Sequence, residues 1–246
     1  MTGPYRLAVD ATAAAADRGV ALRLFGGQAV RHATSEFPPR AYSEQDIDFA
    51  CTSRQAREVV AVLTDLGYVG DERFNALYGH RQMYFQAPDG TTSVDVVVDR
   101  LTMCHELHFA DRIDRLPVTL DITDLLLSKL QVVKINEKDV HDAVYLLAAH
   151  AVAEGDEPGT IGLDRWGEVL GSDWGWWRTV TGNLRALLDQ GTLQSHVPAN
   201  AEHDPFVGSK RLLQHAEDVP KTRRWKLRAR VGDRVRWYEE PEEVQR

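Results

Sequence analysis

The sequence predicts an α/β (α+β) fold, in which a mixed sheet flanked by helices precedes a smaller, mainly helical C-terminal region. Apolar residues in the first 150 positions alternate between helical and strand-like spacing, in the order α-β-α-β-α-β-β-(β)-α-α. All six tryptophans follow residue 160, after the stretch "EGDEPGTIG" (154–162), which is rich in Gly, Pro and acidic residues. We therefore expect two domains, which span residues 1–153 and 160–246.

The first predicted elements surround a pair of glycines. The stretch "PYRLAVDATAAAADRG" has the pattern of a helix that Gly19 ends. The short apolar run "VALRLF" predicts a strand, which meets "GG" at 26–27. Helical spacing then resumes in "QAVRHATSEF".

A second strand and helix follow a loop. "PPRAYSEQ" (38–45) has the composition of a loop, and it leads into the strand "DIDFAC". The stretch "TSRQAREVVAVLTDLG" then predicts a helix, with Thr52 or Ser53 as its N-terminal cap and Gly67 as its terminator.

The remainder of the first domain predicts a hairpin and two helices. "HRQMYFQ" and "SVDVVVD" are strand-like runs joined by "APDGTT", which is a hairpin signal. The stretches "ITDLLLSKLQVVKI" and "EKDVHDAVYLLAAHAV" are apolar at i, i+3, i+4 and i+7, which predicts helices.

The C-terminal region combines tryptophans with positive charge. Trp174 and Trp177 stand at helical spacing and are expected to pack a small helical core. The stretch "RWKLRARVGDRVRWYEE" alternates around "GD", which predicts a β-hairpin. Residues 221–237 hold eight Lys and Arg against Asp233 alone, with two tryptophans interleaved. This segment suits contacts with RNA phosphate and base stacking, and a solvated hairpin explains it equally well.

Charge is unevenly distributed along the chain. The formal net charge is −8, which argues against a generic nucleic-acid-binding protein. Residues 1–160 carry 15 Lys and Arg against 24 Asp and Glu, whereas residues 161–246 carry 14 against 13. The negative charge is therefore concentrated in the N-terminal part.

Composition predicts a cytoplasmic protein with no membrane partner. The hydrophobic content of 43% is ordinary for a globular protein, and no apolar stretch is long enough to span a bilayer. The Ala-rich "LAVDATAAAAD" is interrupted by Asp10 and lacks a basic leader, so we expect no signal peptide. Cys51 and Cys104 form no disulfide framework, and free thiols suit a reducing compartment.

The strand "DIDF" (46–49) carries two carboxylates on one face. Side chains two residues apart on a strand leave the same face, so the Asp46 and Asp48 Cα atoms are about 6.6 Å apart. Asp is disfavoured in strands, so a metal ion, a basic partner or exposure to water is expected to compensate. Taken alone, such a pair is more often a solvated strand edge or a turn.

A third carboxylate lies on the second strand of the predicted hairpin. In "VDVVVD", Asp95, Val97 and Asp99 share a face. If this strand lies beside "DIDF", one of its aspartates joins the first two, and we favour Asp95 over Asp99 because Asp95 begins the apolar run. Three carboxylates that offer oxygen ligands suit Mg²⁺ or Mn²⁺.

The glycine pair precedes these acids. Taken alone, Gly26 and Gly27 form a tight turn. Between a strand and a helix start they also let backbone approach a phosphate, to which the helix N-terminus offers N–H groups and partial positive charge. The succession of strand, Gly-Gly helix start and D-x-D strand is more specific than any of its parts.

The combination "LFGGQAV…DIDF…SVDVVVD" resembles the nucleotidyltransferase fold of the polymerase-beta superfamily. The following "ITDLLLSKLQVVKINEKDVHDAVYLL" looks like two helices of one branch of that superfamily. This branch holds the abortive-infection type IV toxins and related mycobacterial tRNA-targeting toxins. The resemblance covers about residues 20–150 and does not extend to the C-terminal part.

This resemblance implies a division of roles among the site residues. Two divalent cations would be held by Asp46, Asp48 and Asp95. The triphosphate would be held by the helix start at Gly26, Gly27 and Gln28. Many members of the family have Ser where this chain has Gln28, which leaves the phosphate contacts to backbone N–H groups.

The resemblance also assigns roles to the two helices that follow the hairpin. Lys129 would meet the triphosphate as a point charge. Asp142, or Asp139, would position Lys129 or the acceptor.

The expected activity is that of a metal-dependent nucleotidyltransferase. Such an enzyme moves a nucleoside monophosphate from a triphosphate, ATP among them, to an acceptor hydroxyl and releases pyrophosphate. The toxin-like helices and the basic C-terminal segment favour RNA as the acceptor, in particular tRNA. The toxin-branch resemblance makes an antitoxin protein a candidate partner, and the sequence does not reveal whether one exists. Two alternatives are an enzyme that modifies an antibiotic or another small molecule, and a binding module that has lost the chemistry.

Overall fold

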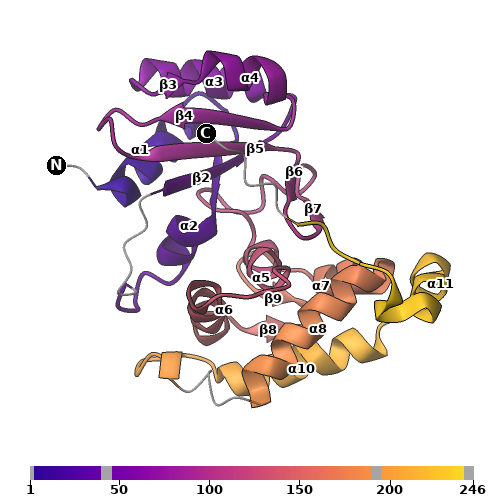
Figure 1. The fold of residues 1–246 in the computed structure, drawn as a ribbon. Helices are drawn as coiled ribbons and strands as arrows, with labels where there is room; N and C mark the ends of the chain where they lie inside the picture. Colours follow the sequence, from indigo (N-terminus) through magenta and orange to yellow (C-terminus); the bar gives the residue numbers. More distant parts are fainter. Residues whose placement is uncertain (1–2, 40–45, 190–194, 241–246) are drawn as a thin grey trace. The chain divides into compact units, whose positions relative to one another are not determined.

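The computed structural model describes residues 3–39, 46–189 and 195–240 (Figure 1). The chain divides into two compact units. The first contains Met1–Ser35, Pro39–Leu101 and His108–Asp121, and the second contains Glu36–Pro38, Thr102–Leu107 and Ile122–Arg246. Most of the loop predicted at 38–45 lies outside the described residues.

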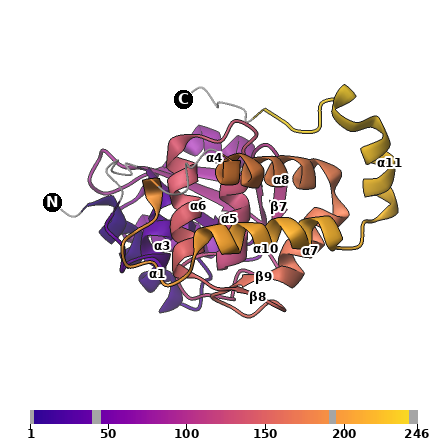
Figure 2. The same ribbon diagram turned by 90° about the horizontal axis from the view of Figure 1, so that it is seen from below.

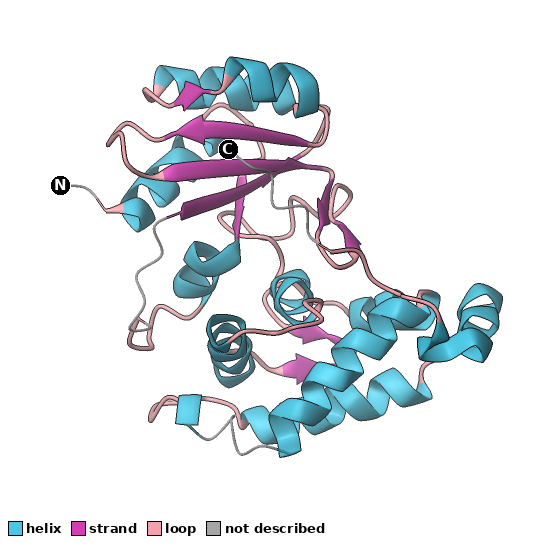
Figure 3. Ribbon diagram, in the orientation of Figure 1, coloured by secondary structure: helices cyan, strands magenta, loops and turns pink. Residues whose placement is uncertain are grey.

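The first unit is built on a five-stranded mixed sheet, drawn in magenta in Figure 3. The strand order is β1-β2-β5-β4-β3, in which β2 and β5 are parallel and the other neighbours are antiparallel. The strands are β1 (Arg23–Phe25), β2 (Asp46–Cys51), β3 (Val69–Gly70), β4 (Gln82–Gln86) and β5 (Ser93–Val98). The predicted mixed α/β fold class is therefore confirmed.

Four helices accompany this sheet in the described part of the first unit: α1 (Pro4–Ala16), α2 (Gly26–Ala33), α3 (Ala56–Asp65) and α4 (Glu72–Tyr78). Helix α1 packs against α3 and contacts β1 and β2, while α2 contacts the same two strands. The alternating side chains of Ile47, Phe49, Val94 and Val96 are fully buried. Burial of this face fixes the register of β2 and β5, because a slip of one residue would expose the whole set.

Two details of the first unit differ from expectation. Helix α3 begins at Ala56 after Gln55, so Thr52 and Ser53 do not cap it. The reason is local, since the Thr52 carbonyl accepts from the Gln55 N–H in a turn and the Ser53 N–H donates to Asp99 Oδ1 at 2.8 Å. Gly67, with φ +85°, ends the helix as predicted.

Strand β3 and helix α4 were not predicted. Two residues of strand give too little periodicity to be recognised in the sequence. Helix α4 is short, but Asp71 caps it by accepting a hydrogen bond from the Phe74 N–H at 2.8 Å. Beyond β5, the short strands β6 (Arg100–Thr102) and β7 (Glu106–His108) pair with each other.

The second unit is mainly helical (Figure 2). Its elements are α5 (Ile122–Leu130), α6 (Glu137–Ala149), β8 (Val152–Ala153), β9 (Ile161–Gly162), α7 (Leu163–Ser172), α8 (Trp174–Asp189), α10 (Pro205–Asp218), α11 (Arg223–Val231) and the 3₁₀ turn η1 (Gly232–Arg234). Among the described residues, no helix combines the length and the apolar character that crossing a bilayer requires.

The last boundary between the two units along the sequence falls between Asp121 and Ile122, whereas the predicted domains 1–153 and 160–246 placed their division within 154–162. The reason is the apolar character of α5, in which all residues except Lys129 are buried. Helix α5 packs against α6, α7 and α8, and α6 packs against α10. The Gly- and Pro-rich stretch is a loop inside the second unit, between the paired strands β8 and β9.

The predicted β-hairpin in the basic segment is wrong. Residues 223–231 form helix α11, and Thr222 caps its start by accepting from the Trp225 N–H at 3.2 Å. Most residues between Arg223 and Arg230 are good helix formers, and the "GD" at 232–233 forms a 3₁₀ turn. The cap and the helix propensity override the alternating pattern.

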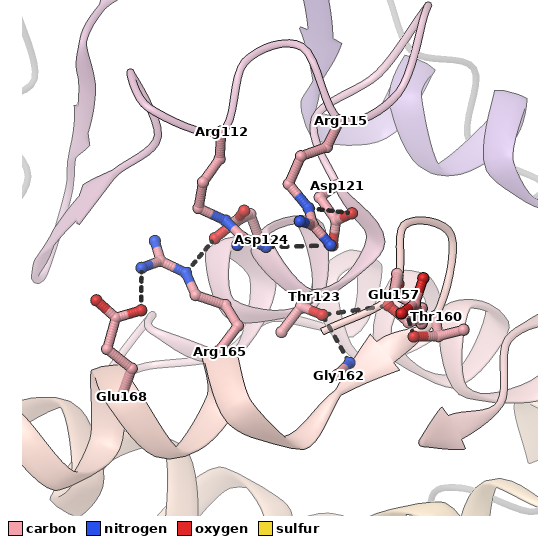
Figure 4. Close-up of polar contacts among 10 residues, drawn as sticks. All are labelled: Arg112, Arg115, Asp121, Thr123, Asp124, Glu157, Thr160, Gly162, Arg165 and Glu168. Atoms are coloured by element: carbon pink, nitrogen blue, oxygen red, sulfur yellow. Dashed lines mark hydrogen bonds and ion pairs between the residues drawn. The ribbon is translucent and has the colours of Figure 1, made fainter. Parts of the chain in front are cut away.

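Each unit contains buried ion pairs (Figure 4). In the first, Arg115 Nε lies 3.0 Å from Asp121 Oδ2 and Arg112 Nη2 lies 3.5 Å from Asp121 Oδ1, and the Asp121 side chain is fully buried. In the second, Arg165 Nε donates to Asp124 Oδ1 at 2.9 Å. Both members of this second pair are less than a tenth exposed.

The junction of β1 and α2 brings backbone against a carboxylate. Gly26 has φ +67°, and a Cβ built on it would overlap Asp48 Oδ2 and lie 3.0 Å from Asp48 Cγ. The glycine therefore meets two requirements, a left-handed backbone conformation and the absence of a side chain.

We predict that Gly26→Ala destabilises the first unit by about 2 to 3 kcal/mol, from left-handed strain and displacement of Asp48. The matched control is Gly90→Ala, which shares a positive φ of +72° but has no atom within 4 Å of the added Cβ. That control should lose only about 1 kcal/mol. Urea unfolding followed by far-UV circular dichroism measures both, and equal losses would contradict the role given to Asp48.

We predict that Arg165→Met destabilises the second unit by about 3 kcal/mol, because it removes the cation that Arg165 places against the buried Asp124 carboxylate. The control is Arg211→Met, whose partner Glu154 is 79% exposed, and which should lose at most about 1 kcal/mol. All six tryptophans lie in the second unit, so tryptophan fluorescence during urea unfolding reports on it. Similar losses of unfolding free energy in the two variants would show that burial does not determine how much an ion pair stabilises the unit.

Candidate functional site

The carboxylates of Asp46, Asp48 and Asp95 lie on one face of the sheet in the first unit. Asp48 stands directly beside Asp95 in the parallel register of β2 and β5, and Asp46 stands beside Ser93. Adjacent strands are about 4.8 Å apart, and the two aspartates of β2 are separated by about 6.6 Å. The alternation that buries Ile47 on the opposite face therefore brings the three acids together.

Two polar neighbours hold the outer carboxylates in this conformation. Ser93 Oγ donates to Asp46 Oδ1 from the adjacent strand, and Gln82 Nε2 donates to Asp95 Oδ1 at 2.8 Å from β4. Sequence reasoning did not identify Ser93 and Gln82. Both residues are identified only by the register of β5 with β2 and β4, and sequence periodicity does not specify that register.

Asp46, Asp48 and Asp95 fit a hard divalent cation, both by the chemistry of their side chains and by the strand register that sets them on one face. They offer carboxylate oxygens, which Mg²⁺ and Mn²⁺ prefer. In the conformation described, however, no group of three or more His, Cys, Asp or Glu side chains within the described ranges is gathered closely enough to bind a metal ion. Cation binding at this face therefore requires the three carboxylates to approach one another more closely than they do in this conformation.

Asp99, the alternative third acid, lies away from this group. It follows the last residue of β5, adopts a φ of +64°, and accepts a hydrogen bond from the Ser53 N–H through Oδ1. The positive φ ends the strand alternation that would have kept Asp99 on the same face as Asp95. Of the two candidates, the register places Asp95 beside Asp48.

The glycine pair begins α2 next to this carboxylate face. The helix starts at Gly26, directly after Phe25, whose side chain supplies no capping oxygen. Gly27 and Gln28 are buried, and Phe25 pairs with Asp48 in the antiparallel register of β1 and β2. The positive end of α2 is therefore close to the acid at the centre of the group, as the prediction of a phosphate-binding helix start requires.

Lys129, Asp139 and Asp142 form a compact charged group in the second unit. Lys129 Nζ lies 2.8 Å from Asp142 Oδ2 and 3.0 Å from Asp139 Oδ1. The Lys129 side chain is 11% exposed, whereas those of Asp139 and Asp142 are 17% and 3% exposed. Both expected partners of Lys129 thus contact it, while its contact with a triphosphate stays a prediction.

The protonation of Lys129 is set by two opposing effects. Burial alone would lower the pKa of its ammonium group, but the carboxylates of Asp142 and Asp139 more than offset burial and raise the pKa above its ordinary value. Lys129 is therefore a fixed cation at neutral pH, and it cannot act as a general base there.

Comparison with known proteins gives weak likenesses only. No protein-family model matches the chain, and no curated protein matches it either. A structure of an antigenic nucleotidyltransferase-like protein from Paracoccidioides brasiliensis aligns at 12% identity and a TM-score of 0.44, covering 81% of this chain and 96% of that one.

Two further solved structures align over different extents. The solution structure of the antibiotic-resistance factor ANT(2'')-Ia gives 15% identity and a TM-score of 0.40, covering 58% of this chain and 81% of that one. A STING-associated CdnE c-di-GMP synthase from Capnocytophaga granulosa gives 12% identity and a TM-score of 0.23, covering 87% and 84%. At these identities and TM-scores the comparisons assign no family to the chain, and its mixed α/β fold rests on the sheet described above.

Proposed function

We propose that the chain is a metal-dependent nucleotidyltransferase, which transfers a nucleoside monophosphate from a triphosphate such as ATP to an acceptor hydroxyl. The observation that carries the proposal is the parallel register that sets Asp48 beside Asp95, with Asp46 on the same face and the Gly26 turn against Asp48. Three acids beside a helix start match the two needs of a metal-bound triphosphate, which are anionic ligands and N–H donors.

Each residue of the first unit has a definite part in this proposal. Asp46, Asp48 and Asp95 hold Mg²⁺ or Mn²⁺, which when bound supplies charge neutralisation and activation of the acceptor hydroxyl. Backbone N–H groups at Gly27 and Gln28 orient the phosphates, and Gly26 lets the helix start approach them without a side chain in the way. Lys129, in the second unit, is held charged by Asp142 and Asp139, and its contact with the triphosphate stays a prediction of the resemblance.

The acceptor that we propose is an RNA. The support is the positive charge of residues 221–237, which contrasts with a chain whose net charge is −8. The resemblance of the sequence to the toxin branch agrees with a tRNA acceptor and implies an antitoxin partner in the cytoplasm. If no nucleotide is transferred to RNA, a small molecule becomes the alternative acceptor.

We predict that Mg²⁺ with a nucleoside triphosphate raises the unfolding temperature of the wild-type protein and that Asp48→Asn abolishes the increase. A ligand at 100 times its dissociation constant stabilises a protein by about 2.7 kcal/mol, a change of several degrees in scanning calorimetry. The ligand-induced shift is compared within each variant, since removing one of two adjacent negative charges alters the unliganded protein too.

The matched control for that measurement is Asp99→Asn. Asp99 carries the same side chain one step beyond β5, and Asn tolerates its positive φ. The control should keep the full ligand-induced shift. A wild-type protein that shows no shift at millimolar Mg²⁺ and triphosphate would refute the proposed nucleotide site.

We predict that label from one α-labelled nucleoside triphosphate moves to RNA in the presence of Mg²⁺, and that Asp46→Ala prevents the transfer. Purified protein is incubated with each of the four triphosphates and total tRNA, and the products are separated by denaturing electrophoresis. Asp99→Asn serves again as the variant that should retain activity.

The other outcomes of label transfer are equally informative. Label on the protein itself would indicate a protein acceptor and contradict the RNA acceptor. If no macromolecule is labelled, pyrophosphate release is measured with a panel of antibiotics, and release would indicate a small-molecule acceptor. Absence of pyrophosphate release with every acceptor would contradict nucleotidyl transfer.

A further inference from the structure

Helix α11 (Arg223–Val231) presents two distinct faces. Trp225, Arg228 and Ala229 follow helical spacing and are half-buried, whereas Arg223, Arg224, Lys226 and Arg230 are exposed. At 100° per residue the four exposed cations occupy a single arc of the helix, with Leu227 and Val231 between them. This basic arc is the outward face of α11.

The inward face of α11 is anchored by aromatic contacts. The Trp225 ring meets the Trp177 ring of α8 edge-on at 5.3 Å between centroids, and the Arg228 guanidinium lies 4.6 Å from the centre of the Trp174 ring. The start of the helix is held by the Thr222 N–H, which donates to the Gly171 carbonyl at 3.0 Å. The tryptophans of this region are thus largely occupied in packing, and the cations are directed outward on a fixed helix.

The positive charge of the basic arc is not balanced by carboxylates among the described residues. Within the described residues, none of its four cations is paired with a carboxylate, although exposed arginines elsewhere in the unit are paired, including Arg185 with Glu217 and Arg211 with Glu154.

The single acid of residues 221–237 is already engaged. Asp233 accepts three hydrogen bonds from Arg178 of α8, from Nε at 3.1 Å and 3.3 Å and from Nη2 at 2.9 Å. This hydrogen bonding holds the pKa of Asp233 below its ordinary value, so Asp233 remains an anion bound to Arg178. The positive charge of α11 is therefore left for an external anion.

We infer that the basic arc of α11 binds the phosphate backbone of RNA, and this inference rests on the proposed function for the choice of RNA over DNA. Four cations within eight helical positions, spread along about 10 Å of helix, match a polyanion with regularly spaced charges. RNA also offers an acceptor hydroxyl on every ribose, as the proposed transfer requires.

The chemistry of the arc distinguishes RNA from an anionic membrane. A basic helix that lies on a bilayer needs a broad apolar face for insertion. The only face of α11 with aromatic side chains is packed against α8, and the outward arc carries two aliphatic side chains among four cations.

The inference is tested by fluorescence anisotropy with labelled total tRNA, in the absence of nucleotide and divalent metal, between about 50 and 200 mM salt. The triple variant R223Q/R224Q/R230Q is compared with the matched variant R54Q/R57Q/R73Q, which removes three exposed arginines from the first unit. Far-UV circular dichroism confirms that both variants are folded, and R230E provides an independent single change.

The α11 variant should bind tRNA at least about tenfold more weakly, and the slope of log affinity against log salt should fall by about two to three. The control should remain within about twofold of wild type. No tRNA binding by the wild-type protein at low salt, equal weakening by both variants, or stronger binding to duplex DNA or phosphatidylserine vesicles would overturn the inference.

This binding measurement is independent of catalysis. A protein that binds tRNA through α11 but transfers no label retains the inference and loses the proposed activity. A protein that labels RNA with wild-type efficiency after the three α11 substitutions retains the activity and loses the inference.

Discussion

The parallel pairing of β2 with β5 sets two aspartates side by side in the middle of a sheet. Asp48 and Asp95 are adjacent in register, and Asp46 precedes Asp48 by two residues on the same face. Such a pairing is imposed by the opposite face, where Ile47, Phe49, Val94 and Val96 are buried and would all be exposed by a shift of one residue. The apolar core therefore holds like charges together, and hydrogen bonds from Ser93 and Gln82 reduce their repulsion.

The same pairing explains why the chain needs glycine at position 26. Because β1 is antiparallel to β2 and Phe25 lies opposite Asp48, the residue after β1 must turn directly over the Asp48 carboxylate. Only glycine combines the positive φ with the missing Cβ that this turn requires. Helix α2 then starts within reach of the acidic face, so one sheet register determines the position of the carboxylates and of the helix start together.

Sequence periodicity predicted the features that local patterns determine, namely strands, their polar faces and a helix end. The alternation of "DIDF" and "VDVVVD" gave the two strands and their polar faces, and Gly67 gave the end of α3. It could not predict that β2 and β5 are direct neighbours or that Asp99 has a positive φ beyond the end of β5, so it left Asp95 and Asp99 as alternatives. It was misled at 223–231, where alternation resembled a strand although the Thr222 cap and good helix formers favour α11. Buried pairs such as Arg165 with Asp124 join residues 41 positions apart, a distance at which one sequence carries no pairing signal.

The charged group around Lys129 sets a condition on the predicted contact between Lys129 and a phosphate. Lys129 is already neutralised by two carboxylates, so a phosphate must compete with an existing ion pair. The two partners are unequal, because Asp142 is almost fully buried while Asp139 is more exposed and lies in the first turn of α6. Release of Asp142 would strand a carboxylate in the interior, whereas release of Asp139 would return one to water. Asp139 is therefore the partner that an incoming anion would displace, and Asp142 is the one that keeps Lys129 charged and in place.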